Sequence, residues 1–221
     1  MFIGHYAAAF AAKRVASRPS LGWFFAACQL PDLVWPLLVL AGVERVSIDP
    51  GNTAFTPLSF DHYPWSHSLL MVAVWGAALG GLYLALRRDL RGALVIESLV
   101  MSHWILDFIT HRPDLPLVPA SSARFGLGLW NNVPATLALE SLFYFGAVAL
   151  YVTITTAKDR VGRVGFWVLV AFLLGTQLAN AFGPPPPNAT MVAASALALW
   201  ILVPVAAWVD KHRTARALPS A

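Results

Sequence analysis

Long apolar segments constrain the fold of this chain more than any other feature of its sequence. A membrane core about 30 Å thick is crossed by roughly 20 residues of apolar helix. Runs of about that length occupy residues 21–43, 66–86, 92–110, 135–157, 164–182 and 189–209. Residues 2–12 are apolar but too short to cross, which indicates an interfacial or re-entrant helix. The sequence therefore predicts an all-α integral membrane protein with about six transmembrane helices.

The composition agrees with this fold class. Of the 221 residues, 58% are hydrophobic and 12% are charged, whereas a soluble domain carries about 25% charged residues. These values exclude a disordered chain and a secreted disulfide scaffold, and they predict one membrane domain over residues 1–221. The net charge is +4, but no run of Lys and Arg is dense enough for nucleic acid. We expect the lipid bilayer to be the partner, with no nucleic acid.

Basic residues predict the orientation of the helices, because Lys and Arg concentrate in cytoplasmic loops. Of the 15 Lys and Arg residues, twelve fall in segments 13–18, 87–91, 158–163 and 211–216. These segments alternate with the predicted spans in a way that puts all four on one side. The other side receives Arg45, Arg112 and Arg124. The sequence therefore predicts that both termini are cytoplasmic.

Ionisable residues inside the third span form the first candidate site. In SHWILDFITHRPD, His103, Asp107 and His111 follow one another at intervals of four residues, so they share a helical stripe roughly 80° wide. Each ionisable residue in a span costs at least about 2.5 kcal/mol, which calls for a partner or a function. Imidazole beside carboxylate suits a divalent metal ion. Pro113 predicts that His111 lies at the helix end, where it bends back to the site or misses it.

Two further segments carry polar residues at similar depth. In DHYPWSHSLL, Ser66 is a candidate N-cap and His67 opens the second span on the outer side, with His62 on the adjoining loop. In QLPDLVWP, two prolines flank Asp32 and predict a broken helix. Counting 1.5 Å per residue from the basic segments puts Asp32, His103 and Asp107 at converging depths in the outer half. His5 fits this depth least well.

Each of these residues also has a purely structural interpretation. His67 could cap a helix, and Asp32 could pair with an Arg or bond the amides freed at the break. Local hydrogen bonds could account for His5, Glu97 and Glu140. The combination of His67, His103 and Asp107 on apolar walls favours a metal site over coincidence.

These motifs resemble the YdjM-like family of inner-membrane proteins, which are predicted metal-dependent hydrolases with motifs loosely similar to those of zinc-dependent phospholipases C. The likeness covers roughly residues 1–115 and leaves 116–221 as additional helices. The family pattern matches His5, LPDL with Asp32, HYPWSHS with His62 and His67, and HWILD with His103 and Asp107. A second family Asp is Val34 here, and an Arg-Gly pair is Tyr63 and Pro64. The resemblance implies a metal site in the inner membrane, with a two-metal site disfavoured by Val34.

The favoured hypothesis is a membrane-embedded metal-dependent hydrolase whose cavity opens to the outer side. A divalent ion, most simply zinc, would be held by some or all of Asp32, His67, His103, Asp107, His5 and His111. His62 or Glu140 would carry protons, and the substrate would be an amphiphilic ester or phosphoester such as a lipid or lipid-linked molecule. A metal or proton transporter and a non-catalytic protein with a structural metal remain alternatives.

Overall fold

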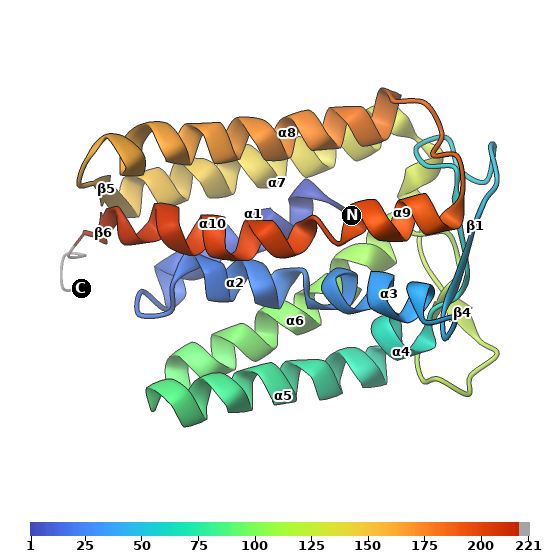
Figure 1. Ribbon diagram of the computed structural model, residues 1–221, viewed down its shortest axis with the longest axis horizontal. Helices are drawn as coiled ribbons and strands as arrows, with labels where there is room; N and C mark the ends of the chain where they lie inside the picture. Colours follow the sequence, from blue (N-terminus) through green and yellow to red (C-terminus); the bar gives the residue numbers. More distant parts are fainter. Residues whose placement is uncertain (217–221) are drawn as a thin grey trace.

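The computed structural model describes residues 1–216, and most of them are helical (Figure 1). The helices are α1 (Ile3–Val15), α2 (Leu21–Cys28), α3 (Leu30–Leu40), α4 (Pro64–His67), α5 (Leu69–Arg87), α6 (Leu90–Thr110), α7 (Val133–Ile154), α8 (Phe166–Phe182), α9 (Ala189–Ala196) and α10 (Leu199–Lys211). A 3₁₀ turn (Leu129–Asn131) precedes α7, and a π-helical turn (Val161–Gly165) precedes α8. The long helices run side by side along the longest axis of the molecule.

The predicted spans are confirmed. Five helical stretches are long and apolar enough to cross a membrane, and α2 with α3 makes a sixth if this pair, bent by 54°, is counted as one span. The bend falls at Gln29, whose backbone is not helical. Pro31 has no backbone N–H to donate, and its ring disturbs the turn before it. The second predicted span is also divided, into α4 and α5. Ser68 caps α5 by accepting from Met71 N, so the prediction that Ser66 is the N-cap is wrong.

Helix α1 lies inside the bundle, where it packs against α7, α2 and α6. Nine of its 13 residues are buried, including His5, Phe10 and Lys13. This position fits the re-entrant alternative predicted for the N-terminal helix and not the interfacial one. The rings of Phe10, Phe25, Tyr144, Tyr151 and Phe166 form an aromatic core around the middle of α1.

Small residues allow two helix pairs to approach closely. A methyl group on Gly22 of α2 would lie 2.6 Å from Ala207 Cβ of α10, and one on Gly80 of α5 would lie 3.0 Å from Ala93 O of α6. Such contacts are common where helices associate within membranes, because apolar side chains gain little there from leaving lipid. These pairs fix the position of α6, which carries two residues of the candidate site, and of α2, which leads into the helix that carries Asp32.

Short strand pairs, which the sequence did not predict, close the two ends of the bundle. β1 (Arg45–Ile48) pairs with β2 (Leu58–His62), and β3 (Leu115–Pro116) pairs with β4 (Arg124–Phe125), each antiparallel. β5 (Thr155–Ala157) and β6 (Arg213–Ala215) pair at the opposite end. We call the end with β5 and β6 the basic end, since the four basic segments gather there, and the end with β1 to β4 the loop end (Figure 1).

The chain termini bear on the predicted orientation. Residue 216 lies at the basic end, whereas Met1 lies inside the bundle beside Asp107. Residues 217–221 lie outside the described part of the chain. The gathering of basic segments at one end agrees with the alternation seen in the sequence, and the cytoplasmic placement of that end stays a prediction.

Candidate metal centre

Five predicted ligands converge in the half of the bundle nearer the loop end. They are His5 of α1, Asp32 of α3, His67 of α4, and His103 and Asp107 of α6; we call this set the His/Asp centre. Two groups within it, His5 with His103 and Asp107, and Asp32 with His67 and His103, each place their ligand atoms within 4.8 Å of one another. The spacing suits a bound cation, because ligand atoms about 2 Å from one ion lie roughly 3 to 4 Å apart.

Local chain geometry explains why these residues meet. His103 and Asp107 are one turn apart on α6, with His103 Nε2 3.1 Å from Asp107 Oδ2. The break between α2 and α3 sets Asp32 in the first turn of α3, where Asp32 Oδ1 lies 3.3 Å from His67 Nε2 and 3.9 Å from His103 Nε2. The break between α4 and α5 lets His67 face inward at the end of a single turn. The breaks between α2 and α3 and between α4 and α5 therefore bring these side chains together.

His103 has one ring nitrogen fixed and the other free. Its Nδ1 lies 2.7 Å from Cys28 O, and a carbonyl only accepts, so Nδ1 carries a proton. Within residues 1–216, the Nε2 atom is buried and has no hydrogen-bond partner, although two carboxylates face it. Either a proton on Nε2 or a cation between Nε2 and the carboxylate oxygens would satisfy these groups. A histidine held at Nδ1 with Nε2 directed at carboxylates is also the arrangement that metal ligands adopt.

His67 is oriented through a relay of two residues. Glu44 accepts from Ser66 Oγ at 2.6 Å and from the amides of Trp65 and Ser66. With its hydroxyl proton given to Glu44, Ser66 Oγ accepts from His67 Nδ1 at 2.7 Å. His67 Nε2 is thereby left as the nitrogen that faces Asp32.

His111 repeats this arrangement at the end of α6. Its Nδ1 lies 3.0 Å from Asp114 Oδ1, which also accepts from Tyr63 Oη at 2.6 Å. Burial, together with the negative Asp114, raises the pKa of Tyr63 well above its usual value, so this hydroxyl stays a donor. His111 Nε2 faces inward and lies 3.9 Å from Asp107 Oδ1. Of the two alternatives for His111, the structure has the one in which it bends back to the site.

His5, the residue that fitted least well by depth, lies at the heart of the centre. Its ring stacks on His103 with centroids 3.8 Å apart, and its Nε2 is 3.0 Å from Asp107 Oδ1. The depth estimate failed because α1 begins within the bundle beside α6. Glu140 of α7 holds this end of α1, since its Oε2 accepts from Phe2 N at 2.9 Å and Gly4 N at 3.2 Å. Glu140 Oε1 is buried without a partner.

The centre contains more negative than positive side chains. Neither Asp32 nor Asp107 forms an ion pair with a Lys or Arg among residues 1–216. The amine of Met1 lies 2.6 Å from Asp107 Oδ1 and 3.1 Å from Thr110 Oγ1. Asp107 is buried, while the Asp32 side chain is 28% exposed. Asp32 is therefore the member of the centre that solvent or a ligand reaches most easily.

A cavity of about 500 Å³ leads to the centre. Asp32, His67, Asp107 and His111 line it on one side. The rest is largely apolar and aromatic, with contributions from α3, the loops at the loop end, α8 and α9: Trp35, Phe55, Phe60, Trp130, Pro184, Val192 and Leu199 are among its lining residues. A polar floor under apolar walls is typical of pockets for small or amphiphilic ligands.

A family model for the YdjM inner membrane protein matches residues 1–182. The chain belongs to the YdjM inner membrane protein family. It is therefore an inner membrane protein, and the resemblance inferred from its motifs is confirmed and extends well past residue 115. Neither the comparison with curated proteins nor that with solved structures gave a match.

Two predicted residues of this YdjM-family chain stand apart from the five ligands. His62 is on β2, where its backbone pairs with Arg45, and within the described residues no hydrogen bond or ion pair joins its side chain to the centre. Glu140 contacts the backbone before α1 and not the ligand side chains. The proton-carrying roles assigned to both stay predictions.

Sequence reasoning missed the residues that orient the histidines. Asp114 had a local signal, because it follows His111 by three residues in HRPD. Ser66 was predicted to cap a helix, whereas its hydroxyl holds His67 Nδ1 and donates to Glu44. Glu44 reaches its partners across 22 residues of loop and strand, and the Cys28 carbonyl across 75 residues, so neither had a recognisable signal in the sequence.

Proposed function

We propose that this protein is a membrane-embedded metal-dependent hydrolase. One observation carries the proposal: His67, His103 and His111 each have Nδ1 fixed by a protein group, and each directs Nε2 at the carboxylates of the centre. Histidines that bind metal are oriented in this way, with the distal nitrogen bonded to a carboxylate, hydroxyl or carbonyl. The centre is also buried among apolar helices, and ionisable residues in that environment are costly unless they have a function.

The donors fit a divalent first-row ion, most simply zinc. Neutral imidazole nitrogen and carboxylate oxygen are its preferred ligands in catalytic sites. His5, His67, His103, Asp32 and Asp107 would hold it, and the shared His103 explains why two overlapping triads occur. When bound, such an ion lowers the pKa of a water molecule toward neutrality and supplies a nucleophile.

The remaining residues have roles that follow from their contacts. Asp32 is partly exposed to the cavity and would accept a hydrogen bond from the attacking water. His111 Nε2 lines the same cavity and, held by Asp114, would carry a proton to the leaving group. Glu140 would position His5 by holding the start of α1.

The cavity supports an amphiphilic substrate. Its volume of about 500 Å³ accommodates a polar headgroup with its linkage but not two full acyl chains. Its apolar walls lie next to α8 and α9, which carry exposed apolar side chains such as Phe172 and Phe182 of α8 and Met191 of α9. An ester or phosphoester of a lipid or lipid-linked molecule could thus be bound with its chains in the bilayer.

A conducting role is less consistent with the bundle. An ion pathway needs polar groups through both halves of the membrane, but the aromatic core around Phe10 occupies α1 between the centre and the basic end. Conduction through this core would require several packed rings to separate.

The decisive test is turnover by the purified full chain on a panel of lipid esters and phosphoesters, with zinc, manganese or no added metal. Asp107→Ala should lose bound metal and turnover together. His111→Gln should keep its metal and slow turnover by about a hundredfold or more. His212→Ala is the matched control, because His212 lies at the basic end and pairs with Asp159. A metal-loaded wild type that hydrolyses nothing on the panel would replace the hydrolase with a structural metal protein.

The hydrolase would work from the outer side if the basic end is cytoplasmic, as the distribution of Lys and Arg favours. A reporter that is active only in the cytoplasm, fused after residue 221, should then be active. An inactive reporter at normal protein levels would reverse the proposed orientation and put the cavity on the cytoplasmic side.

A further inference from the structure

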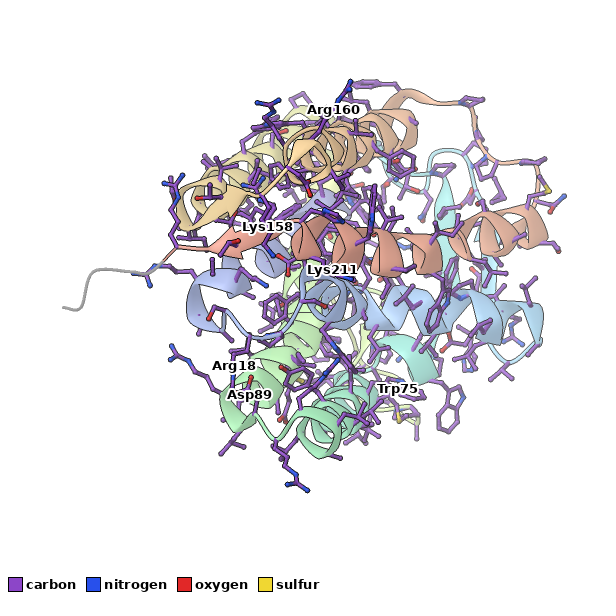
Figure 2. The ribbon with its side chains drawn as sticks, turned by 60° about the vertical axis from the view of Figure 1, so that its left-hand side comes forward. Arg18, Trp75, Asp89, Lys158, Arg160 and Lys211 are labelled. Atoms are coloured by element: carbon purple, nitrogen blue, oxygen red, sulfur yellow. The ribbon has the colours of Figure 1, made fainter. Side chains whose placement is uncertain are left out.

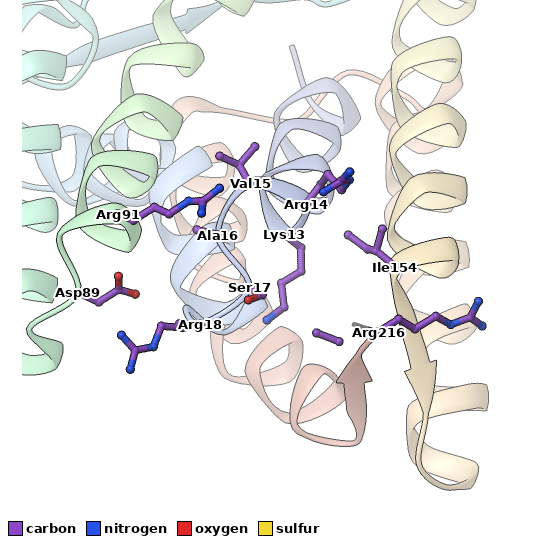
Figure 3. Close-up of a pocket in the computed structure, with 11 residues that line it drawn as sticks. Lys13, Arg14, Val15, Ala16, Ser17, Arg18, Asp89, Arg91, Ile154 and Arg216 are labelled. Atoms are coloured by element: carbon purple, nitrogen blue, oxygen red, sulfur yellow. The ribbon is translucent and has the colours of Figure 1, made fainter. Parts of the chain in front are cut away.

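A second cavity, of about 400 Å³, lies at the basic end, far from the His/Asp centre (Figure 3). It is bounded by the end of α1, the connection to α2, the start of α6, the end of α7 and the segment after β6. Five basic side chains line it, namely Lys13, Arg14, Arg18, Arg91 and Arg216, against one acidic side chain, Asp89. The hydrolase proposed above uses none of them.

Three of these side chains already have partners within the protein. Lys13 Nζ contacts Asp210 Oδ2 at 2.6 Å and donates to Pro19 O. Asp89 accepts from Gly92 N at 3.2 Å and from Tyr83 Oη at 3.2 Å. Arg216 donates its Nε to Thr156 Oγ1. The acid at the rim is therefore held as a helix cap.

Arg14, Arg18 and Arg91 are different. Within residues 1–216, their guanidinium groups make no hydrogen bond and no ion pair. They come from three separate elements, namely α1, the connection after it, and α6, and Figure 3 shows them around the same cavity. By contrast, Arg213 nearby is fully engaged with Thr155 and Gly162 and stacks over Phe166. The free guanidinium groups leave a positive cavity with no internal partner.

We propose that this cavity binds a phosphate group, and that its source is the headgroup of an anionic phospholipid in the leaflet at the basic end. The planar donor fork of Arg matches phosphate oxygens, and basic clusters beside membrane helices attract anionic lipids. Val15, Ala16 and Ile154 supply an apolar wall beside the guanidinium groups, where the carbons next to a phosphodiester would lie. A soluble phosphate ester shares the recognised group and is separated from the lipid by experiment.

The rule that puts basic residues on the cytoplasmic side does not explain this arrangement, because orientation needs only their presence at one end. Arg160 lies at the same end outside this cavity, as does Arg163. Figure 2 shows Arg18 and Asp89 on one part of the basic end and Lys158, Arg160 and Lys211 on another. A place in the lining of one cavity, without a partner among residues 1–216, is what distinguishes Arg14, Arg18 and Arg91.

The test compares two variants of the purified full chain that lose equal charge at the same end. Arg18→Gln with Arg91→Gln removes two free guanidinium groups from the cavity, and Arg160→Gln with Arg163→Gln removes two from outside it. Native mass spectrometry in detergent measures retention of added phosphatidylglycerol. We expect affinity to fall by about tenfold or more in the first variant and by less than twofold in the control.

A second arm separates the sources of phosphate. Inorganic phosphate is titrated while the melting temperature is followed, with matched chloride as the ionic-strength control. Stabilisation by free phosphate that the first variant abolishes would assign the cavity to soluble phosphate esters, and lipid retention alone would assign it to the headgroup. Arg14→Gln should weaken either response in the same direction. Equal losses in the cavity and control variants, or no response in either arm, would overturn the proposal.

Discussion

Two buried polar clusters lie at opposite ends of helix α1, and they differ in how their charges are balanced. Near the basic end, Lys13 and Asp210 form an ion pair at 2.6 Å, and Asp210 also accepts from Tyr151 Oη and Leu21 N. No side-chain nitrogen or oxygen of this pair lacks a partner. At the other end, the His/Asp centre has two carboxylates without a Lys or Arg partner among residues 1–216, one of which pairs with the Met1 amine, and a buried imidazole nitrogen without a hydrogen bond.

The difference is the one expected between a structural cluster and the proposed metal site. A paired and fully hydrogen-bonded cluster joins α1, α2, α7 and α10 and needs nothing from outside. In the His/Asp centre, the buried His103 Nε2 has no hydrogen-bond partner among residues 1–216, and buried polar groups without partners are costly. The comparison predicts that the first cluster supports folding alone and that the second gains its stability from a ligand.

The largest expected effect is on metal binding. His103→Ala removes the nitrogen shared by both ligand triads, so bound zinc should fall from about one ion per chain to less than a tenth. Elemental analysis of dialysed protein measures this directly. His212→Ala, which removes a histidine from the basic end, should leave metal content unchanged.

Chelation sharpens the same contrast. A bound ligand stabilises the folded state in proportion to its affinity and free concentration, so removing zinc should lower the melting temperature of the wild type. The melting temperature of His103→Ala should not respond to the chelator. A chelator response of equal size in both proteins would mean that the ion lies outside the His/Asp centre.

The next largest effect is on stability at the basic end. Lys13→Met leaves Asp210 as a buried and unpaired charge, which should cost about 3–5 kcal/mol of the free energy of unfolding. Lys13→Met with Asp210→Asn removes the charge but keeps an acceptor for Tyr151, and it should recover more than half of the loss. The measurement is denaturant unfolding in detergent, with exposed Arg14→Met as the control. Metal content should stay normal in the folded fraction of all three variants.

The sequence predicted those parts of the molecule that depend on local pattern. Apolar length located the spans, and the four-residue interval from His103 to Asp107 placed both residues on one face of α6. Pro31 indicated the bend that turns Asp32 inward, whereas Pro36, which was also predicted to interrupt the helix, lies inside the continuous helix α3. These features depend on residues within a few turns of one another, so they can be predicted without knowledge of tertiary contacts.

What the sequence could not supply depends on packing between distant elements. His5 stacks on His103 because α1 enters the bundle beside α6, and nothing in residues 2–12 encodes that neighbour. Glu44 and Ser66 meet because β1 and β2 pair and fold the intervening loop back. The depth of each residue was counted along its own helix from a basic segment. This count fails for α1, which begins inside the bundle.

A smaller effect should follow from breaking the relay behind His67. Ser66→Ala removes the hydroxyl that holds Nδ1 and separates the ring from Glu44. Loss of such a supporting residue reduces metal affinity by about 10–100-fold, so zinc should still bind but more weakly in competition with a chromogenic chelator. Ser98→Ala, which loses only a bond to its own helix, is the matched control. An unchanged affinity would show that the orientation of His67 is set by packing instead.

The smallest effect concerns the hydroxyl of Tyr63, two steps from the centre. Tyr63→Phe removes one hydrogen bond to Asp114 and leaves His111 with its acceptor, so the cost should be about 1 kcal/mol, or roughly fivefold in turnover by the proposed hydrolase. Because burial and Asp114 raise the pKa of Tyr63, its hydroxyl stays protonated as the pH rises toward its ordinary pKa. The ratio of wild-type to Tyr63→Phe turnover should therefore be constant between about pH 7 and 9, with the ordinary pKa near 10. The ratio should approach one only above the ordinary pKa, where deprotonation of Tyr63 removes its hydrogen-bond donor from the wild type. A ratio that changes within the lower range would place a titrating group other than Tyr63 in this network.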